Sequence, residues 1–287
     1  MRLLSLVVAT AALELGWLAL WPLSGALSHS ALFNAALLAD YPLVAQVFSA
    51  SLAMAQHALP TLTDRPLTDA LGDPVYTAPA TALAAVFVWL GLAYLTGLWL
   101  LNRGVAQLRA AVPFVIGAAL VFQATLLLLP GLFSQDVFSY IAYGRLSAVY
   151  ELNPYVWPPS ATPKDSVLPW VAIIWRTYPT PYGPVWLDVQ WAMARVFGGL
   201  PIAQQAIAYR ALAQGLLLVN LALLWLVLGR LTSLTRGQRA TALAALAWNP
   251  LVLFEVGANA HNDVLMVTFS LIAVLLFVRS YREPLSA

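Results

Sequence analysis

Long runs of apolar residues, with few charged positions inside them, follow one another along most of the chain. A helix needs about 20 mostly apolar residues to cross the hydrocarbon core of a bilayer. Six runs satisfy this requirement and are predicted to span a membrane: 3–23, 78–101, 110–130, 205–229, 239–257 and 264–279. The pattern therefore predicts an all-α, polytopic membrane protein with about six transmembrane helices.

The first run shares features with a secretory signal peptide, since it lies at the N-terminus behind one basic residue, Arg2. No small-x-small cleavage site follows it, and Trp21-Pro22 is unsuited to one. We therefore expect this run to be retained as an anchoring span.

Two weaker apolar stretches, 31–59 and 184–199, are interrupted by polar residues. Cytoplasmic loops collect Lys and Arg, and all basic clusters fall on one side only if neither weak stretch crosses. Both chain ends are then cytoplasmic, 184–199 is an amphipathic helix on the outer membrane surface, and 31–59 forms one or two outer apolar helices. The basic clusters are Arg2, Arg103 with Arg109, Arg230 with Arg236 and Arg239, and Arg279 with Arg282. The acids predicted outside are Asp64, Asp69, Asp73, Asp136, Glu151, Asp165 and Asp263.

This topology divides the chain into an N-terminal span with an outer apolar segment, 1–77, and a transmembrane module, 78–287. The module carries a large outer loop, 131–204, in which Pro, Trp and Tyr are frequent. Proline fixes φ and stiffens a loop. A stiff aromatic loop above a membrane indicates a binding surface rather than a passive connection.

Composition supports the membrane assignment and excludes several functions. Of 287 residues, 61% are hydrophobic and 9% are charged, whereas a soluble domain has roughly 25% charged residues. The net charge of +2 is too small and dispersed for nucleic-acid binding. The absence of cysteine excludes a disulfide framework, a thiolate metal site and a cysteine nucleophile.

The first candidate site follows the run that ends near residue 130. Ser134 is predicted to cap a helix whose first turn contains Asp136. At helical spacing Asp136, Tyr140 and Tyr143 share one face. A carboxylate among tyrosines at the membrane surface is a candidate general base toward a sugar hydroxyl. The alternative is that Asp136 only complements the helix dipole.

The second candidate site is the segment from Arg176 to Trp186, in which three prolines and a glycine predict a rigid turn. Arg176 presents a fixed fork of donors that suits a phosphate. The alternative is a structural turn with a solvated arginine.

The third candidate site places Glu255, Asn259, His261, Asn262 and Asp263 at the junction of two spans. Ionisable residues at a membrane boundary indicate function by default, although capping of the next helix by Asn259 or Asn262 is a structural alternative. A divalent cation held by the acids and the histidine is a further possibility, but the spacing matches none of the usual metal motifs.

Arg210 lies near the outer end of the span 205–229. At that depth an arginine either reaches the interface along its aliphatic stem or meets a partner, of which a lipid-linked phosphate is one.

Three segments, in order, resemble the polyprenyl-phosphate-mannose-dependent α-1,6-mannosyltransferases, a family of the C superfamily of membrane glycosyltransferases. The first is Phe133-Ser134-Gln135-Asp136-Val137-Phe138-Ser139-Tyr140 with Gly144-Arg145 and Asn153-Pro154-Tyr155. The second is Thr180-Pro181-Tyr182-Gly183-Pro184-Val185-Trp186. The third is Trp248-Asn249-Pro250 with Glu255 and His261-Asn262-Asp263. The resemblance covers roughly residues 75–280.

The resemblance implies an inverting transfer, independent of metal or cofactor, of a hexose from a polyprenyl-phosphate donor to a glycan or glycolipid acceptor. It implies that Asp136 is the base and that the active face is outside the plasma (inner) membrane. Gln135 stands where relatives often carry a basic residue, so the tuning of Asp136 is expected to differ. The expected substrate-binding residues are Tyr140, Tyr143, Arg145, Asn153, Tyr155, Arg176, Tyr182, Arg210, Glu255, Asn259, His261, Asn262 and Asp263.

Members of this family usually continue for several further spans, so the chain is expected to be a fragment or a half that a second chain completes. The alternative function is a catalytically incomplete scaffold or lipid-binding partner. A transporter is disfavoured, because its polar residues should lie near the middle of spans, whereas the clusters here lie at span ends.

Overall fold

The computed structural model describes residues 2–27, 30–60, 67–68, 74–75, 77–103, 110–230 and 234–282. Four charged residues used in the predicted topology, Asp64, Asp69, Asp73 and Arg109, lie outside these residues.

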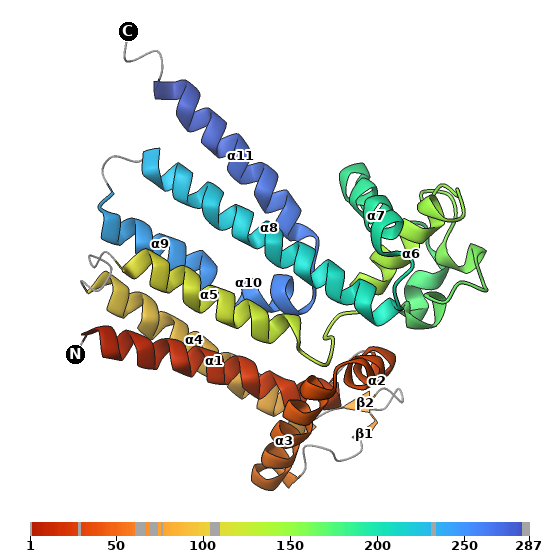
Figure 1. Cartoon of the computed structure of the whole chain (residues 1–287), viewed down its shortest axis with the longest axis horizontal. Coiled ribbons are helices and arrows are strands. Elements are labelled where there is room, and N and C mark those ends of the chain that lie inside the picture. Colours follow the sequence, from red (N-terminus) through yellow and green to blue (C-terminus); the bar gives the residue numbers. More distant parts are fainter. Residues whose placement is uncertain are drawn as a thin grey trace.

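Long helices running side by side form a bundle (Figure 1). Its members are α1 (Arg2–Leu27), α4 (Thr77–Asn102), α5 (Ala111–Leu127), α8 (Ile202–Arg230), α9 (Arg236–Ala247) and α11 (Asp263–Arg282). The closest packing joins α1 to α4 and α8 to α11. Large apolar side chains remain exposed on the outside of the bundle, such as Leu92, Phe269 and Phe277. A helix that is apolar on all sides is stable where lipid replaces water, so the all-α membrane fold is confirmed.

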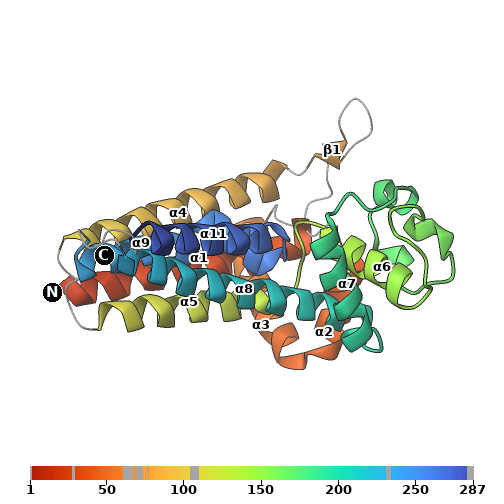
Figure 2. The same cartoon turned by 90° about the horizontal axis from the view of Figure 1, so that it is seen from above.

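Helix length and composition alone give fewer spans than the six predicted. Four helices are long and apolar enough to cross a membrane, and the bent pair Arg236–Ala247 and Pro250–Ala258 makes a fifth. The remaining candidate, α5, has 17 residues, which is at the short limit for a span. It nevertheless lies within the bundle beside the long helices (Figure 2), so the sixth span stays a prediction.

The basic residues at the ends of the long helices are separated along the bundle from Asp263, whereas Arg145 in α6 and Arg195 in α7 lie at the same end as Asp263. The chain passes back and forth, so that the ends of α1, α4, α8, α9 and α11 that carry Arg2, Arg103, Arg230, Arg236 and Arg279 lie together (Figures 1 and 2). The start of α11 at Asp263 lies at the opposite end, with α6 and α7. This separation agrees with the charge pattern from which the topology was predicted.

The two weak apolar stretches form separate helices outside the long bundle. Stretch 31–59 forms α2 (Ala31–Asp40) and α3 (Pro42–Ala58), in agreement with the predicted one or two helices. They separate at Tyr41, because the residue before a proline avoids the helical region. Stretch 184–199 forms α7 (Pro184–Phe197), which crosses the direction of the bundle (Figure 2).

Helix α7 is amphipathic, as predicted. Trp186, Gln190 and Ala194 are buried on one face, whereas Trp191 and Val196 are exposed. Its placement on a membrane surface stays a prediction.

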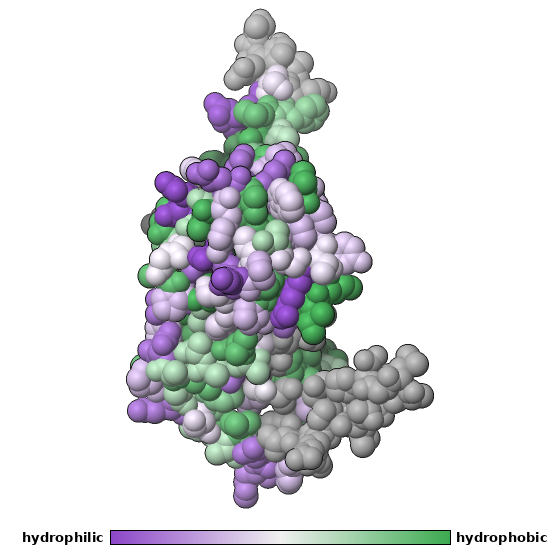
Figure 3. Space-filling model, turned by 90° about the vertical axis from the view of Figure 1, so that its right-hand side faces the viewer, coloured by the Kyte–Doolittle hydropathy of each residue, from purple (hydrophilic) through white to green (hydrophobic). Residues whose placement is uncertain are grey.

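The remaining helices lie in the loop 131–204 and, near the end of the bundle, between α9 and α11. They are α6 (Asp136–Ala148), the 3-10 helices η3 (Pro159–Ala161), η4 (Leu168–Trp170) and η5 (Ile173–Thr177), α10 (Pro250–Val252) and the π-helix η6 (Leu253–Ala258). A short antiparallel pair joins β1 (Leu67–Thr68) and β2 (Pro74–Val75). Figure 3 faces this end of the molecule, where hydrophilic and hydrophobic residues are interspersed.

Gly144 permits the close crossing of α6 and α7. A Cβ atom on Gly144 would lie 2.3 Å from the carbonyl oxygen of Gln190, which belongs to the backbone of α7. The contact is too short for any side chain, and a backbone oxygen cannot swing away as a side chain can. The close packing of α6 on α7 therefore requires glycine at this position.

Replacing Gly144 by Ala should separate α6 from α7 and destabilise the protein by about 1–3 kcal/mol, as overpacking does. Thermal unfolding in detergent would measure the loss. Gly215→Ala is the matched control, because a Cβ at this helical glycine meets no atom within 4 Å and alanine favours a helix. A Gly144→Ala protein as stable as the wild type would contradict this account of the crossing.

Candidate functional site

Asp136 is the first residue of α6, and its side chain is partly exposed. The helix begins one residue later than predicted: Gln135 occupies the N-cap position, and Ser134 instead accepts a hydrogen bond at Oγ from the Asp136 main-chain N–H, at 3.2 Å. The Asp136 side chain is 37% exposed, whereas most of α6 after it is buried. This carboxylate is therefore accessible from solvent.

His261 joins Asp136 to a second carboxylate. Its Nδ1 lies 3.1 Å from the Glu255 carboxylate, and its Nε2 lies 3.8 Å from the Asp136 carboxylate. The three side chains come from two segments, because Asp136 precedes Glu255 and His261 by more than a hundred residues in sequence. The structure therefore brings the first and third predicted clusters into one site.

A π-helix holds Glu255 and His261 in this arrangement. Residues Leu253–Ala258 form η6, and single π-helical turns are frequent at functional sites. The chain then reverses at Ala260, which adopts a positive φ of 59°. The His261 main-chain N–H donates to the Glu255 carbonyl at 3.0 Å, so the turn returns His261 to the residue that its ring also contacts.

Asn259 ties this turn to the segment before α6. Its side-chain Oδ1 accepts from the Phe133 main-chain N–H at 3.1 Å, and its own main-chain N–H donates to the Phe254 carbonyl. The side-chain amide of Asn259 therefore links the two halves of the site. Because Asn259 is buried, this amide is not exposed to solvent.

Arg210 is fully buried and crosslinks the same two segments. Its guanidinium donates to the carbonyls of Leu129 at 2.7 Å and Gly131 at 2.6 Å, both just before α6. It also donates to Ala258 in η6 at 2.7 Å and to Leu127 at 3.2 Å. In this structure Arg210 therefore crosslinks backbone segments, and the phosphate role expected for it stays a prediction.

Tyrosines form the wall of the site beside Asp136. The rings of Tyr140 and Tyr182 lie 5.0 Å apart edge to face, and the Tyr140 hydroxyl donates to Oδ1 of Asn262 at 3.4 Å. The Tyr143 hydroxyl donates to the Tyr178 carbonyl at 3.0 Å. Burial raises the pKa of Tyr143 to about 12 and raises those of Tyr140 and Tyr182 further. These hydroxyls therefore keep their protons at any physiological pH.

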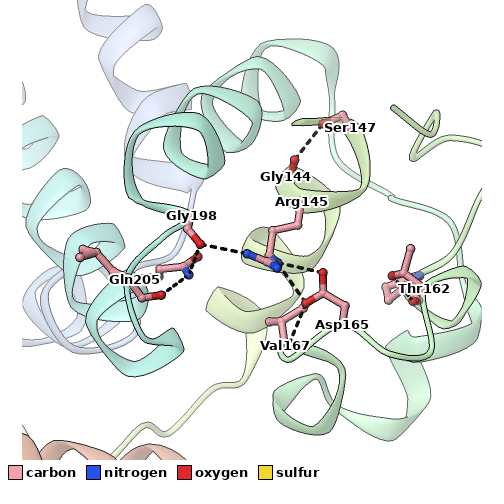
Figure 4. A network of polar contacts seen from close by, with 10 residues as sticks. Gly144, Arg145, Ser147, Thr162, Asp165, Val167, Gly198 and Gln205 are labelled. Carbon is pink, nitrogen blue, oxygen red and sulfur yellow. Dashed lines mark hydrogen bonds and ion pairs between the residues drawn. The ribbon is translucent and has the colours of Figure 1, made fainter. Parts of the chain in front are cut away.

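Arg145 and Arg176 have other partners in this structure. The Arg145 guanidinium binds Asp165 at 2.9 Å and donates to the Gly198 carbonyl at 3.1 Å (Figure 4). Arg176 donates to the carbonyls of Val171 and Pro169. Both arginines thus stabilise the outer loop, and a phosphate role for either stays a prediction.

Asn153 and Tyr155 also organise the loop. The Asn153 side chain accepts from the Tyr155 main-chain N–H at 3.0 Å, which closes a turn. The Tyr155 hydroxyl donates to the Tyr182 carbonyl at 3.0 Å. These bonds fix the aromatic segment 153–157 beside the turn that carries Tyr182, close to the site.

A cavity of about 240 Å³ leads from the carboxylates into the bundle. It lies between α8, the bent pair of α9 and α10, and α11, and its lining is mostly apolar. Glu255, His261 and Asp263 are its polar residues at the site, and Asn220 is a fourth. Two larger cavities, between α1 and α4 and between α5, α8 and α9, are lined by no charged side chain.

The structure also shows two polar residues that the sequence patterns did not single out. The Gln214 side chain donates to the carbonyls of Gln123 and Gly257, and Asn220 donates to Val264. Both lie in α8, as Arg210 does. Their position as polar residues inside an apolar span is the sequence signal that could have identified them. Among the described residues, no group of three or more His, Cys, Asp or Glu side chains has the arrangement of a metal site.

Comparison with known proteins assigns the family. The sequence pattern of the family described as alpha-(1->6)-mannopyranosyltransferase, N-terminal domain, matches residues 41–285. Alpha-(1->6)-mannopyranosyltransferase A of Mycobacterium tuberculosis is 30% identical over 69% of this chain and 37% of its own length. The B enzyme of Corynebacterium glutamicum is 27% identical over 68% of this chain and 32% of its own length.

The chain thus spans about a third of the length of these relatives. No solved structure matches it. The family match covers all three candidate sites and confirms the resemblance drawn from them. This chain belongs to the alpha-(1->6)-mannopyranosyltransferase family and corresponds to its N-terminal domain.

Proposed function

We propose that the chain transfers mannose from a polyprenyl-phosphate donor to a hydroxyl of a glycan or glycolipid, on the extracytoplasmic side of the plasma membrane. The observation that supports this most is the position of Asp136. Its partly exposed carboxylate lies 3.8 Å from Nε2 of His261, and His261 lines the apolar cavity between the helices. A lipid-linked donor and a water-soluble acceptor would meet between this cavity and this carboxylate.

The reaction needs little covalent chemistry from the protein. Asp136 accepts the proton of the acceptor hydroxyl while that oxygen attacks the anomeric carbon. The bond from the anomeric carbon to the phosphate oxygen breaks, and its electron pair leaves with the lipid phosphate. Attack opposite the leaving group inverts the configuration at this carbon. Positioning and charge stabilisation then supply most of the acceleration.

The cavity suits the isoprenoid part of the donor. Leu217, Leu246 and Val264 line it from the bundle helices α8, α9 and α11, and Val256 lines it from η6. Val267 and Leu251 line the cavity and are also exposed at the bundle surface, so a chain in the bilayer has lateral access. The phosphate and sugar would then lie next to Glu255, His261 and Asp263.

The charge separation supports the proposed orientation. The end of the bundle with Arg103, Arg230, Arg236 and Arg279 fits the cytoplasmic side. The site at Asp136 lies at the other end and would then face outward. The partners of the protein are the bilayer, the lipid-phosphate donor and the glycan acceptor, and a second chain is a candidate to complete the donor site.

The direct test is transfer by the purified chain in nanodiscs. It would be incubated with radiolabelled polyprenyl-phosphate-mannose and a short mannoside, with and without a chelator. We expect labelled product of inverted configuration in both reactions. A folded, monodisperse chain that forms no product would overturn the proposal for this chain and favour the scaffold or lipid-binding alternative.

Filling the cavity should weaken use of the long-chain donor. Val267→Trp places a large ring where the isoprenoid is proposed to enter, and we expect KM for the long-chain donor to rise about tenfold, equivalent to about 1.4 kcal/mol. A short-chain donor analogue should be used as before. Val274→Trp is the matched control, because Val274 is equally exposed on α11 but does not line the cavity. An equal rise for both variants would show that the cavity does not hold the donor.

A further inference from the structure

His261 is held by Glu255 in one ring orientation. The Glu255 carboxylate can only accept a hydrogen bond, so Nδ1 of His261, 3.1 Å away, carries a proton. The His261 main-chain N–H also donates a hydrogen bond to the Glu255 carbonyl. This bond and the positive φ of Ala260 fix the main chain that carries the ring. In the neutral imidazole the lone pair then lies at Nε2.

That second nitrogen is buried and lacks a hydrogen-bond partner among the described residues. Buried polar atoms are nearly always bonded, so an unpaired one calls for an explanation. The nearest acid to Nε2 is Asp136 at 3.8 Å. This distance is too long for a direct hydrogen bond, yet a small movement of either side chain would close it.

Three carboxylates lie around His261. Asp136 approaches it from α6 and Glu255 from η6, and Asp263 begins α11 at the same cavity. The Tyr140 hydroxyl donates to the neighbouring Asn262 side chain. Tyr182 lies beside Tyr140 and, like it, remains neutral. The carboxylates and a departing phosphate are therefore the negative charges that an imidazolium would offset.

Resting on the function proposed above, we propose that His261 is the second proton acceptor of the transfer reaction. The acceptor hydroxyl gives its proton to Asp136, and Asp136 passes it to Nε2 of His261. The imidazolium that results is stabilised by the Glu255 carboxylate and later releases the proton to solvent. Asp136 thus returns to its charged form within the turnover, and Glu255 acts as a positioning residue for the ring.

The kinetic test compares His261→Gln with the wild type across the pH range. We expect kcat to fall about 100-fold, in the range of general acid–base catalysis, while KM for the donor stays the same. The wild-type rate should fall at low pH as Nε2 becomes protonated in the resting enzyme, and His261→Gln should lack this acid limb. Glu255→Gln keeps an oxygen acceptor for Nδ1 but removes the counter-charge, so its acid limb should move to lower pH.

His57→Gln is the matched control, because His57 is exposed near the end of α3, and its profile should equal that of the wild type. Suppose that His261→Gln has the wild-type kcat and an unchanged acid limb, while Asp136→Asn is inactive. This result would overturn the role of His261 but not that of Asp136. Loss of thermal stability in His261→Gln without a change of pH profile would show a structural role instead.

A second measurement needs no activity and therefore separates this inference from the proposed function. The chain has three histidines, so the 15N spectrum of a histidine-labelled sample is simple to assign with His261→Gln and His57→Gln. At alkaline pH we expect His261 as the neutral tautomer protonated at Nδ1, and that preference should weaken in Glu255→Ala. A tautomer protonated at Nε2 would overturn the inference.

Discussion

Replacing Asp136 by Asn should reduce mannosyl transfer by about 10²–10⁴-fold, the contribution of a positioned general base. Asparagine has nearly the same shape and keeps the main-chain bond to Ser134 that begins α6. Its amide, however, cannot accept the proton of the acceptor hydroxyl. The loss should therefore fall on kcat, with protein abundance and thermal unfolding unchanged, as measured by transfer assays in nanodiscs.

Asp188→Asn provides the matched control for charge. Asp188 is exposed on α7 in the same outer region, so this variant removes one negative charge without touching the site. We expect wild-type transfer from it. If Asp136→Asn also transferred mannose at the wild-type rate, Asp136 would not be the base, and the scaffold or lipid-binding alternative would gain support.

Replacing Arg210 by Ala should strongly destabilise the protein. The change leaves four backbone carbonyls, those of Leu127, Leu129, Gly131 and Ala258, without their donor. Leaving one buried acceptor unsatisfied costs about 1–3 kcal/mol, so four such carbonyls should cost about 3 kcal/mol or more. Size-exclusion chromatography and thermal unfolding in detergent should show a destabilised or aggregated protein.

Arg210→Lys keeps this prediction testable if Arg210→Ala fails to fold. A lysine ammonium is a compact group without the planar fork of guanidinium, so it cannot reach both the segment before α6 and η6. We expect an intermediate loss of stability and, at temperatures where the protein is folded, reduced transfer, because Asp136 and His261 are no longer held together.

Arg230→Ala is the control on the same helix, since Arg230 is exposed at the end of α8. It should unfold like the wild type. An Arg210→Lys protein with wild-type stability and activity would show that the buried network does not position the site.

The membrane character of the chain could be predicted from the sequence, because it depends on local properties and not on tertiary contacts. Runs of apolar residues long enough to cross a bilayer appear directly in the order of residues. Helices 78–101, 205–229 and 264–279 were predicted within a few residues of α4, α8 and α11. The break at Tyr41-Pro42 and the amphipathic helix at 184–199 also follow from local rules.

Asp136 and the cluster from Glu255 to Asp263 were identified in the sequence as well, but separately. Each stands out because a charged residue at a membrane boundary is costly. Nothing in the local pattern determines that His261 contacts Glu255 on one side and approaches Asp136 on the other. That meeting depends on how α5, α8 and η6 pack against one another.

Arg210 shows most clearly what only the tertiary structure decided. From sequence, an arginine near the end of a span should reach the interface or bind a phosphate. The structure instead brings four carbonyls to it where α5 ends and where η6 departs from α-helical bonding. Carbonyls at helix ends have no partner within their own helix, and in an apolar bundle a buried donor must supply one. The sequence alone determined which segments are apolar enough to cross a membrane and which residues carry charge, because both are local properties. The tertiary structure decided which charged residues contact one another. Unsatisfied backbone groups in distant segments form hydrogen bonds with such residues only when the helices pack together.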